Sequence, residues 1–360
     1  MTNKFITFIL CVTVFSFTSC SEDNLPSEPI KIVIEGATIS PEVGGPNQPN
    51  QVYVDLSTST TTSIKRDSWD LGFYSGTNSR VILNGSIYMA AGAIASTNID
   101  AVNSTSIEVQ DLQPKVAVGT FDAANTVYVD APDGTITNTA VAEVSITDAN
   151  NKVYLLNLGY KVGTETPATG SVSVSGNLRG WKKIRVLKSG NDYVLQYADL
   201  DATTHNEITI SKDSNYNFSF FSFDTNSEVS VQPEKTEWDL NFTVFTNEIS
   251  GFGSYGYSDF VVNNSKSSAR VYMIDTDIEA YTYENFTISD IKNSNFTDDQ
   301  RSIGSSWRNG GGPGSLPSLK ENLFYIVNDT EGNFYKLQFL ALTNADGKRG
   351  HPEFVYSQLQ

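Results

Sequence analysis

Residues that could hold a metal or attack a substrate are scarce in this chain of 360 residues. The histidines are His205 and His351, and the cysteines are Cys11 and Cys20. His205 lies in a polar stretch and His351 lies between glycine and proline, so we interpret both as solvated residues of loops or turns. A catalytic triad needs a histidine beside a nucleophile, and the sequence indicates no such arrangement. We therefore expect a binding protein and not an enzyme.

Acidic side chains could instead serve as paired general acids and bases. Asp130 with Asp133, and Asp298 with Asp299, are two such pairs. Their positions in turn-like segments fix no geometry between the carboxyl groups. The glycine-rich segment 310–314 follows no strand–helix pattern, so it does not predict a phosphate-binding loop. A hydrolase with a carboxylate site is the weakest of three functional hypotheses.

The composition predicts a globular fold rich in β-strands. The chain is 39% apolar and 18% charged, and it contains 17 tyrosines and 20 phenylalanines. Aromatic and β-branched residues favour strands, and long runs of helix-forming residues are scarce. The formal net charge of −17 repels phosphate backbones, so we exclude nucleic acid as a partner.

Residues 1–20 form a predicted lipoprotein signal peptide. Lys4 precedes an apolar run over residues 5–17 that is too short for a comfortable membrane span. The following Thr-Ser-Cys resembles a bacterial lipobox, which would make Cys20 the acylated first residue of the mature protein. An ordinary secretory signal is the alternative. Cys11 would leave with the signal, so the mature domains would hold no disulfide and no thiol nucleophile.

Residues 21–49 are predicted to form a flexible tether. They begin with Ser-Glu-Asp-Asn, which resembles the acidic tag of surface-exposed lipoproteins from Bacteroidetes. We expect a protein held in the outer membrane by its lipid and facing the cell exterior. Extended backbone is favoured here by five prolines: Pro26, Pro29, Pro41, Pro46 and Pro49.

A repeated motif indicates the architecture. The sequence Trp-Asp-Leu-x-Phe occurs twice, each time after a short strand and a polar turn, and Trp69 and Trp238 are 169 positions apart. Alternation places each tryptophan on one face with the leucine and phenylalanine that follow, so both are predicted core anchors. Asp70 and Asp239 are expected to bond nearby backbone or turn groups.

Each repeat also closes with three similar strands. Lys183 and Lys336 fall in register within the middle strand of each set. Residues 152–157, 181–187 and 194–197 correspond to residues 323–328, 334–340 and 353–356. Two copies of one unit account for this pattern. The predicted fold class is all-β, with two tandem antiparallel units: repeat 1 over residues 50–200, a linker over 201–213, and repeat 2 over 214–360.

Both repeats resemble the HmuY family of haem-binding lipoproteins from Bacteroidetes. The resemblance rests on the Trp-Asp strand, a glycine-rich middle, an aromatic strand, a turn, a strand with an internal lysine and a last strand ending in tyrosine. Residues 330–333 and 336–339 match that ending well. The resemblance covers most of residues 50–360, in two copies where the best-known members have one.

The resemblance implies a domain that captures haem at the outer membrane and passes it to a TonB-dependent receptor. The haem would come free or from a haem-carrying protein of the host. Family members often hold the iron between two axial histidines, and others use methionine. The family pattern places one ligand at or near Gly311 and the other near residues 273–283. Neither segment contains a histidine here.

Three other side chains are candidates for haem contact. Met273 lies on a predicted strand, and methionine can ligate haem iron, although it is more often a core residue, as we expect for Met89. Tyr255 and Tyr257 lie in a predicted glycine–aromatic loop over residues 251–258, where a ring could stack on a porphyrin. Such rings also stack on sugars. A surface adhesin, or a module that binds glycans or peptides, is therefore the alternative function.

Overall fold

The computed structural model describes residues 35–311 and 315–360. The predicted signal peptide, the lipidation site Cys20 and the first part of the tether lie outside these ranges. The ladders between the described strands are antiparallel, which confirms the all-β fold class. None of the helices in these ranges is long and apolar enough to cross a membrane.

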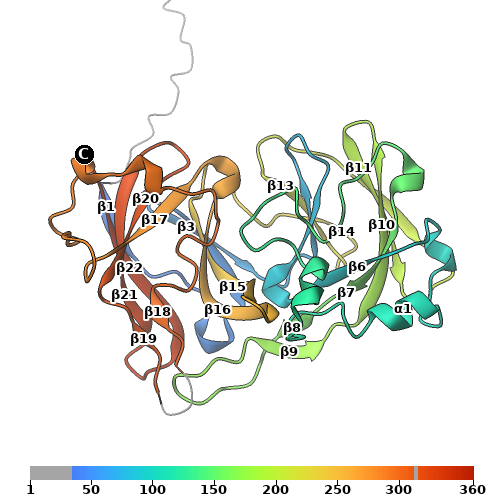
Figure 1. Ribbon diagram of the computed structural model, residues 1–360, viewed down its shortest axis with the longest axis horizontal. Coiled ribbons are helices and arrows are strands. Elements are labelled where there is room, and N and C mark those ends of the chain that lie inside the picture. The colour runs from blue at the N-terminus through green and yellow to red at the C-terminus, as the bar shows by residue number, and fades with distance from the viewer. Residues whose placement is uncertain (1–34, 312–314) are drawn as a thin grey trace, which may run out of the picture. The chain divides into compact units, whose positions relative to one another are not determined.

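Two five-stranded sheets contain the closing strands of the repeats (Figure 1). In spatial order, one consists of β12 (Asn206–Ile210), β11 (Asp192–Asp199), β10 (Trp181–Ser189), β7 (Val153–Asn157) and β6 (Ala90–Ile94). The other consists of β1 (Gly36–Ile39), β22 (Arg349–Gln358), β21 (Phe334–Thr343), β20 (Leu323–Asn328) and β17 (Arg270–Asp275). The predicted closing strands are thereby confirmed.

Two four-stranded sheets contain the Trp-Asp strands. One has the order β14 (Ser227–Val229), β13 (Phe218–Ser222), β4 (Leu71–Tyr74) and β5 (Val81–Leu83), and the other β16 (Gly253–Asn263), β15 (Leu240–Ile249), β2 (Asn50–Asp55) and β3 (Thr60–Lys65). Two short pairs join β8 (Tyr160–Val162) to β9 (Ser175–Leu178) and β18 (Arg308–Asn309) to β19 (Ser318–Leu319).

Helical segments are short and lie between strands. The α-helix is α1 (Ile107–Leu112). The 3-10 helices are η1 (Gly45–Asn47), η2 (Gly85–Ile87), η3 (Ile99–Ala101), η4 (Ala123–Tyr128), η5 (Asp148–Asn150), η6 (Ser265–Ser267), η7 (Ile288–Asp290) and η8 (Asn293–Asn295).

The two repeats exchange their opening strands. Strand β2 of repeat 1 pairs with β15 of repeat 2, with Val54 opposite Leu240. Reciprocally, β13 of repeat 2 pairs with β4 of repeat 1. The strand before each exchanged strand also pairs with the other repeat. Strand β1, before β2, pairs with β22, and β12, before β13, pairs with β11. In Figure 1 the blue strand β1 accordingly lies beside the red strands of the C-terminal sheet.

The exchange divides the fold into two bodies that differ from the sequence repeats. We call residues 66–235 body 1, which is continuous in sequence and contains β4 to β14. Body 2 joins residues 36–65 to residues 236–360 and contains β1 to β3 and β15 to β22.

Two predicted boundaries change as a result. The tether expected over residues 21–49 is shorter, because β1 and η1 within it belong to the fold, and Val43 is buried. The linker expected over residues 201–213 contains β12, which pairs with β11. Both β1 and β12 are short edge strands, of four and five residues. Each has only two alternating apolar residues, Ala37 with Ile39 and Ile208 with Ile210, which is too short a pattern to predict a strand.

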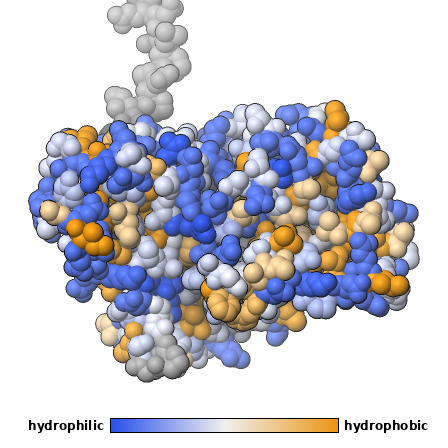
Figure 2. All heavy atoms as spheres, viewed as in Figure 1, coloured by the Kyte–Doolittle hydropathy of each residue, from blue (hydrophilic) through white to orange (hydrophobic). Residues whose placement is uncertain are grey.

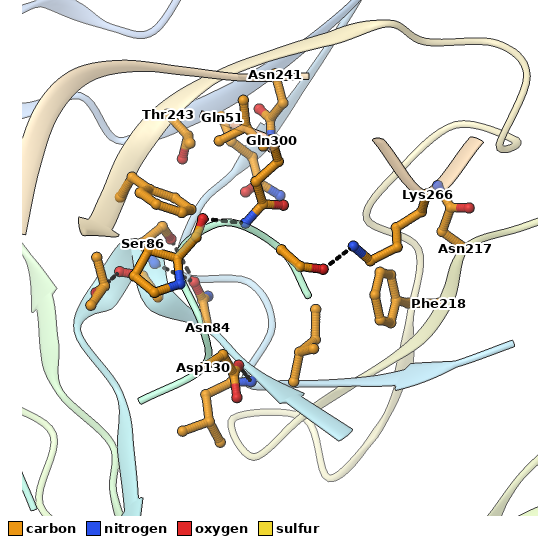
Figure 3. Close-up of a pocket in the computed structure, with 18 of the residues that line it drawn as sticks. Gln51, Asn84, Ser86, Asp130, Asn217, Phe218, Asn241, Thr243, Lys266 and Gln300 are labelled. Carbon is orange, nitrogen blue, oxygen red and sulfur yellow. Dashed lines mark hydrogen bonds between the residues drawn. The ribbon is translucent and has the colours of Figure 1, made fainter. Parts of the chain in front are cut away.

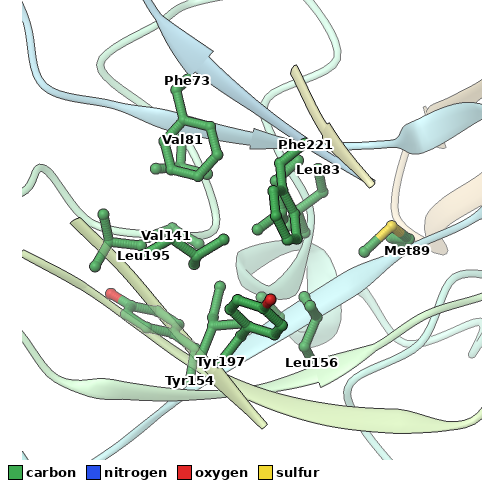
Figure 4. Packing of buried hydrophobic residues seen from close by; sticks show 14 of the residues in the cluster. Phe73, Val81, Leu83, Met89, Val141, Tyr154, Leu156, Leu195, Tyr197 and Phe221 are labelled. Carbon is green, nitrogen blue, oxygen red and sulfur yellow. The ribbon is translucent and has the colours of Figure 1, made fainter. Parts of the chain in front are cut away.

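Each body has a hydrophobic core built from both repeats. In body 1, Phe221 and Phe223 of the exchanged segment belong to one cluster with Leu71 and Tyr197. Figure 4 shows Phe221 and Tyr197 within this cluster. In body 2, Val54 packs in one cluster with the strands that follow Trp238. Fully burying one such side chain stabilises a fold by roughly 1.5–3 kcal/mol. The exchanged strands are therefore integral parts of the cores that receive them.

The Trp-Asp motif fastens each exchanged segment. Trp69 and Trp238 are buried, as predicted, and each packs edge to face against one ring, Phe220 and Tyr53 respectively. The predicted backbone bonding of the aspartates is also confirmed. Asp70 accepts a hydrogen bond from the backbone N–H of Phe223 (2.6 Å), and Asp239 accepts one from Leu56 (2.9 Å).

The internal lysines have the same structural role in both bodies. Lys183 is fully buried, and its Nζ donates to the carbonyl oxygens of Val102 (2.5 Å) and Ala202 (2.7 Å). Lys336 Nζ likewise donates to the carbonyl oxygen of Phe286 (3.1 Å). Lys183 thus binds the segment that follows β6, and Lys336 binds the segment that follows β17. Both β6 and β17 are edge strands of their sheets.

Candidate functional site

The two tyrosine candidates lie on a strand and not in the predicted loop. Residues 253–258 belong to β16, and the turn from β15 is confined to residues 250–252. The glycines misled the prediction, because they serve close packing: a Cβ on Gly256 would lie 2.3 Å from the Tyr88 ring. The rings of Tyr255 and Tyr257 contact each other at a centroid distance of 5.8 Å, and Tyr255 is 41% exposed.

Tyr255 belongs to an exposed aromatic patch that the sequence did not reveal. The Phe121 ring, which is 62% exposed, lies 5.8 Å from the Tyr255 ring. The segment is held alongside β16 because the Gly119 N–H donates to the Ser254 carbonyl oxygen (3.0 Å). Phe252 is also exposed, in the adjoining turn. We call Phe121, Phe252 and Tyr255 the aromatic patch.

Phe121 adopts a backbone conformation that is unusual for a large side chain. Its φ is 55°, in the left-handed region where residues other than glycine are uncommon. Such strain costs on the order of 1–3 kcal/mol and often marks a functional segment. Nothing in the spacing or composition of the sequence connects Phe121 with Tyr255, so the pairing follows only from the fold.

Exposed large hydrophobic side chains also occur elsewhere, among them Ile107, Ile146 and Ile278. On the face shown in Figure 2, hydrophobic residues are scattered among hydrophilic ones. Phe121 and Tyr255 differ from a single exposed side chain, because their rings contact each other.

Met273 lies in a different sheet from the tyrosines. It stands on β17, at the edge of the C-terminal sheet, opposite Tyr325, and it is 42% exposed. Exposure on an edge strand leaves its sulfur free to meet a ligand, whereas Met89 is a core residue, as expected. Gly311 has a φ of 74°, and residues 312–314 of the glycine-rich segment lie outside the described ranges.

The histidines and the carboxylate pairs have structural neighbours. His205 Nδ1 lies 2.9 Å from Asp100 Oδ1, and His351 is exposed on β22, not in the predicted turn. Asp298 and Asp299 contact arginines. Among the residues that the structure describes, no group of three or more His, Cys, Asp or Glu side chains could hold a metal ion.

A cavity of about 180 Å³ lies where the two bodies meet (Figure 3). Both bodies line it, and it is hereafter called the inter-body cavity. It places the two motif tryptophans around one space, which the sequence repeat alone could not indicate. Its lining includes Trp69, Asp130, Trp238, Asn241, Asn263 and Lys266.

Charged groups of the cavity are held by backbone atoms. The Asp130 carboxylate accepts hydrogen bonds from the N–H groups of Leu83 (2.7 Å) and Ala140 (2.9 Å), and burial raises its pKa to about 6. Lys266 Nζ donates to the carbonyl oxygen of Gly134, and burial lowers the pKa of this lysine. The Asp130 carboxylate is thus bonded to the backbone of two separate segments.

Comparison with known proteins gives a family match in both repeats. A family model described as HmuY protein matches residues 47–204 and 214–356. Among solved structures, the apo HmuY analog of Tannerella forsythia (TFO) is similar, with 10% sequence identity and a TM-score of 0.25. That match covers 91% of this chain and 98% of the other. No curated protein matches the chain. The two family matches span most of the chain, which therefore belongs to the HmuY family and carries two copies of its unit.

Proposed function

We propose that this protein binds haem at the aromatic patch and delivers it to an outer-membrane uptake receptor. The observation that carries the proposal is the exposed Tyr255 ring with Phe121 against it and Phe252 in the adjoining turn. A porphyrin is a flat apolar ring system, and exposed aromatic rings offer it a surface for stacking. Family membership in both repeats supports a haem-related ligand.

Tyr255 is the side chain best suited to meet the iron. Tyrosine is one of the four side-chain types that hold haem iron in proteins. Tyr257 supports its ring from the side. Met273 is a separate candidate in another sheet. The inter-body cavity, at about 180 Å³, lies below the roughly 300–1,000 Å³ typical of sites for larger ligands, so the proposed haem site is the open patch.

The proposed setting follows from the N-terminus. A lipid on Cys20 would hold the protein in the outer membrane, facing the exterior. Haem would arrive free or from a haem-carrying host protein, and a TonB-dependent receptor would take it up. In this proposal the protein binds its ligand without reacting with it. The contacts of the carboxylates agree with that, because Asp130 bonds to the backbone and Asp298 and Asp299 contact arginines.

A haemin titration tests the proposal. Residues 21–360 are mixed with haemin, and the Soret band is recorded in the ferric and ferrous states. We expect a shifted band in the wild type, a changed ferric band in Tyr255→Phe, and about tenfold weaker binding in Phe121→Ala. Tyr216→Phe, at a half-buried tyrosine of body 1, is the control. Met273→Ala reports on the second candidate.

Two results would contradict the proposal. Absence of a shift in both redox states would reject haem as the ligand and favour the adhesin or glycan-binding alternative. A shift that Tyr255→Phe and Phe121→Ala leave unchanged would reject the aromatic patch. If Met273→Ala then altered the band, the site would lie on β17.

A further inference from the structure

The strand pair that carries Tyr255 is much longer than its counterpart in body 1. Each pair begins directly after a Trp-Asp dipeptide and ends directly before an asparagine, Asn84 or Asn264. Strands β15 and β16 have 10 and 11 residues, whereas the equivalent strands β4 and β5 have 4 and 3. Residues 244–260 extend beyond the shorter pair, and we call them the arm.

The arm of body 2 lies on body 1. The Thr246 hydroxyl donates to the carbonyl oxygen of Gly85 in η2 (2.6 Å), and the Gly119 N–H donates to that of Ser254 (3.0 Å). Strand β15 packs against η2, and β16 packs against η4 (Figure 1). Both strands of the arm are therefore held by body 1.

Two glycines of the arm permit this close contact. A Cβ on Gly253 would lie 2.6 Å from the carbonyl oxygen of Asp122, and a Cβ on Gly256 would lie 2.3 Å from the Tyr88 ring. Real Cβ atoms do not approach other heavy atoms so closely. A side chain at either position would therefore displace the arm from body 1.

Docking of the arm completes the aromatic patch. Phe121 belongs to body 1, whereas Phe252 and Tyr255 belong to the arm, so the contact between the Phe121 and Tyr255 rings joins the two bodies. Phe121 directly precedes Asp122, whose carbonyl oxygen faces Gly253. A flat ligand that covers rings of both bodies binds the docked arm more tightly than a displaced one, and it stabilises docking to the same extent.

We propose that the arm couples haem capture to the contact between the two bodies. With the arm docked, haem lies across Phe121 and Tyr255. Displacement of the arm separates these rings and lowers the affinity, so a receptor that competes with body 1 for the arm releases haem without touching it. This coupling rests on the proposed haem site and supplies the means by which that site is opened.

Gly253→Ala tests the coupling, and Gly332→Ala is the matched control. Both glycines have a φ of 91°, but a Cβ on Gly332, in the turn between β20 and β21, meets nothing within 4 Å. Two quantities are measured on residues 21–360: hydrogen exchange of the Gly119 amide without haem, by NMR, and haemin affinity from the Soret band. We expect Gly253→Ala to speed the exchange and to weaken haemin binding, each about tenfold, as the loss of one hydrogen bond or one ring contact predicts. Gly332→Ala should change neither.

Thr246→Val is a second test, which leaves the backbone of the arm unstrained, and Thr243→Val is its control. The Thr246 hydroxyl bonds to body 1, whereas the Thr243 hydroxyl bonds to the Val244 carbonyl oxygen within β15 (3.0 Å). We expect Thr246→Val to speed the exchange and weaken haemin binding, and Thr243→Val to leave both unchanged. If Gly253→Ala does not fold, this pair of variants decides.

The outcomes separate the coupling from haem capture itself. Absence of a Soret shift in the wild type would overturn both. Faster Gly119 exchange with unchanged haemin affinity, in Gly253→Ala or Thr246→Val, would overturn the coupling and leave haem capture standing. Equal effects of Gly253→Ala and Gly332→Ala would overturn the role of the contact with Asp122.

Discussion

At the residue scale, the two motif aspartates show how one position is stabilised in different ways. Asp70 and Asp239 both bind the backbone of the exchanged segment. Burial raises the pKa of Asp70, and Arg179, with Nη1 at 2.5 Å, opposes that rise. Asp239 is held instead by the backbone N–H and hydroxyl of Thr330 (2.8 and 3.1 Å). The same motif is thus compatible with an ion pair or with neutral donors.

Replacement of Arg179 by methionine should be strongly destabilising. It would leave the fully buried Asp70 carboxylate without its cation, and breaking a buried pair in this way costs about 3–5 kcal/mol. Urea unfolding of Arg179→Met measures the change. Arg270→Met is the control, because its partner Asp298 is 80% exposed and such pairs contribute about 0–1 kcal/mol. Equal losses in the two variants would contradict the assigned role.

Asp239 should make the protein less stable as the pH rises towards neutrality. Burial raises its pKa from 3.8 to about 7, so the unfolded chain releases this proton at lower pH than the folded protein. The resulting stabilisation is complete below about pH 4 and is lost as the pH rises through about 7. Each unit of pKa difference between the folded and unfolded states corresponds to about 1.4 kcal/mol, so the free energy of unfolding falls by about 2–4 kcal/mol over this range.

Asp239→Asn isolates this effect. Because other buried carboxyl groups also titrate, the quantity to compare is the difference in unfolding free energy between wild type and variant at pH 4.5 and pH 7.5. We expect the variant to be less stable at pH 4.5, where it loses one hydrogen bond, and to recover relative to wild type at pH 7.5. A difference that does not change with pH would show that Asp239 is ionised in the fold throughout this range.

The sequence predicted these residues better than it predicted the patch. Trp69, Trp238 and the two aspartates were recognisable because strand alternation fixes which side chains point inward. Phe121 was not recognisable, because it lies in a stretch without periodicity and meets Tyr255 only through the folded chain. Local patterns therefore report on burial, whereas a surface site built from distant segments leaves no local pattern.

At the element scale, the dipeptide Asn84-Gly85 shows how a turn signal can mislead. Asn-Gly between apolar residues predicts a two-residue hairpin. Here Asn84 has a φ of −70°, and η2 follows it, so the chain passes from β5 in one sheet to β6 in another. The Asn84 amide donates to the carbonyl oxygens of Arg66 and Trp69 (both 2.7 Å).

The same connection recurs in body 2, where the sequence has no glycine. Asn264 donates to the carbonyl oxygens of Lys235 and Trp238, both at 2.9 Å. The helix η6 follows, and the residue after it, Ser268, has a φ of 76°. The asparagine, which bonds back to the chain around the motif tryptophan, is thus the conformational determinant of this connection, and the glycine is not.

Gly159 is essential to the packing of this connection. It has a φ of 67°, and a Cβ placed on it would lie 1.9 Å from the carbonyl oxygen of Ile87. Gly159→Ala should therefore cost several kcal/mol in urea unfolding, because the backbone of η2 must move. Gly180→Ala is matched in backbone conformation, with a φ of 92°, but its Cβ meets nothing within 4 Å. It should cost only about 1–2 kcal/mol, and similar losses in both would contradict the steric explanation.

At the scale of the whole molecule, the repeats in sequence and the bodies in space are different divisions. The sequence predicted the number of units and the strands of each, because the pattern recurs. It could not predict which copy supplies the opening strands. Strands β2 and β13 have similar patterns, so pairing within a repeat or between repeats buries similar side chains. Only the connecting segments distinguish the two arrangements.

The exchange predicts which fragments fold. Residues 66–235 contain both sheets of body 1, so this fragment should unfold cooperatively and give a dispersed amide NMR spectrum. Residues 50–200, the predicted repeat 1, would lack β12 to β14 and would carry β2 and β3 without their partner β15. This second fragment should stay largely unfolded. The opposite result would show that the opening strands can return to their own repeat.

The exchange also sets an order in time. Strand β1 is among the first parts of the fold to be synthesised, and its partner β22 is among the last, with Gly36 opposite Ser357. At roughly 5–20 residues per second, the first strand waits on the order of tens of seconds for its partner. Body 1 is complete long before, because its strands are consecutive. Folding during synthesis would therefore begin in the middle of the chain, and the residues made first would be incorporated last.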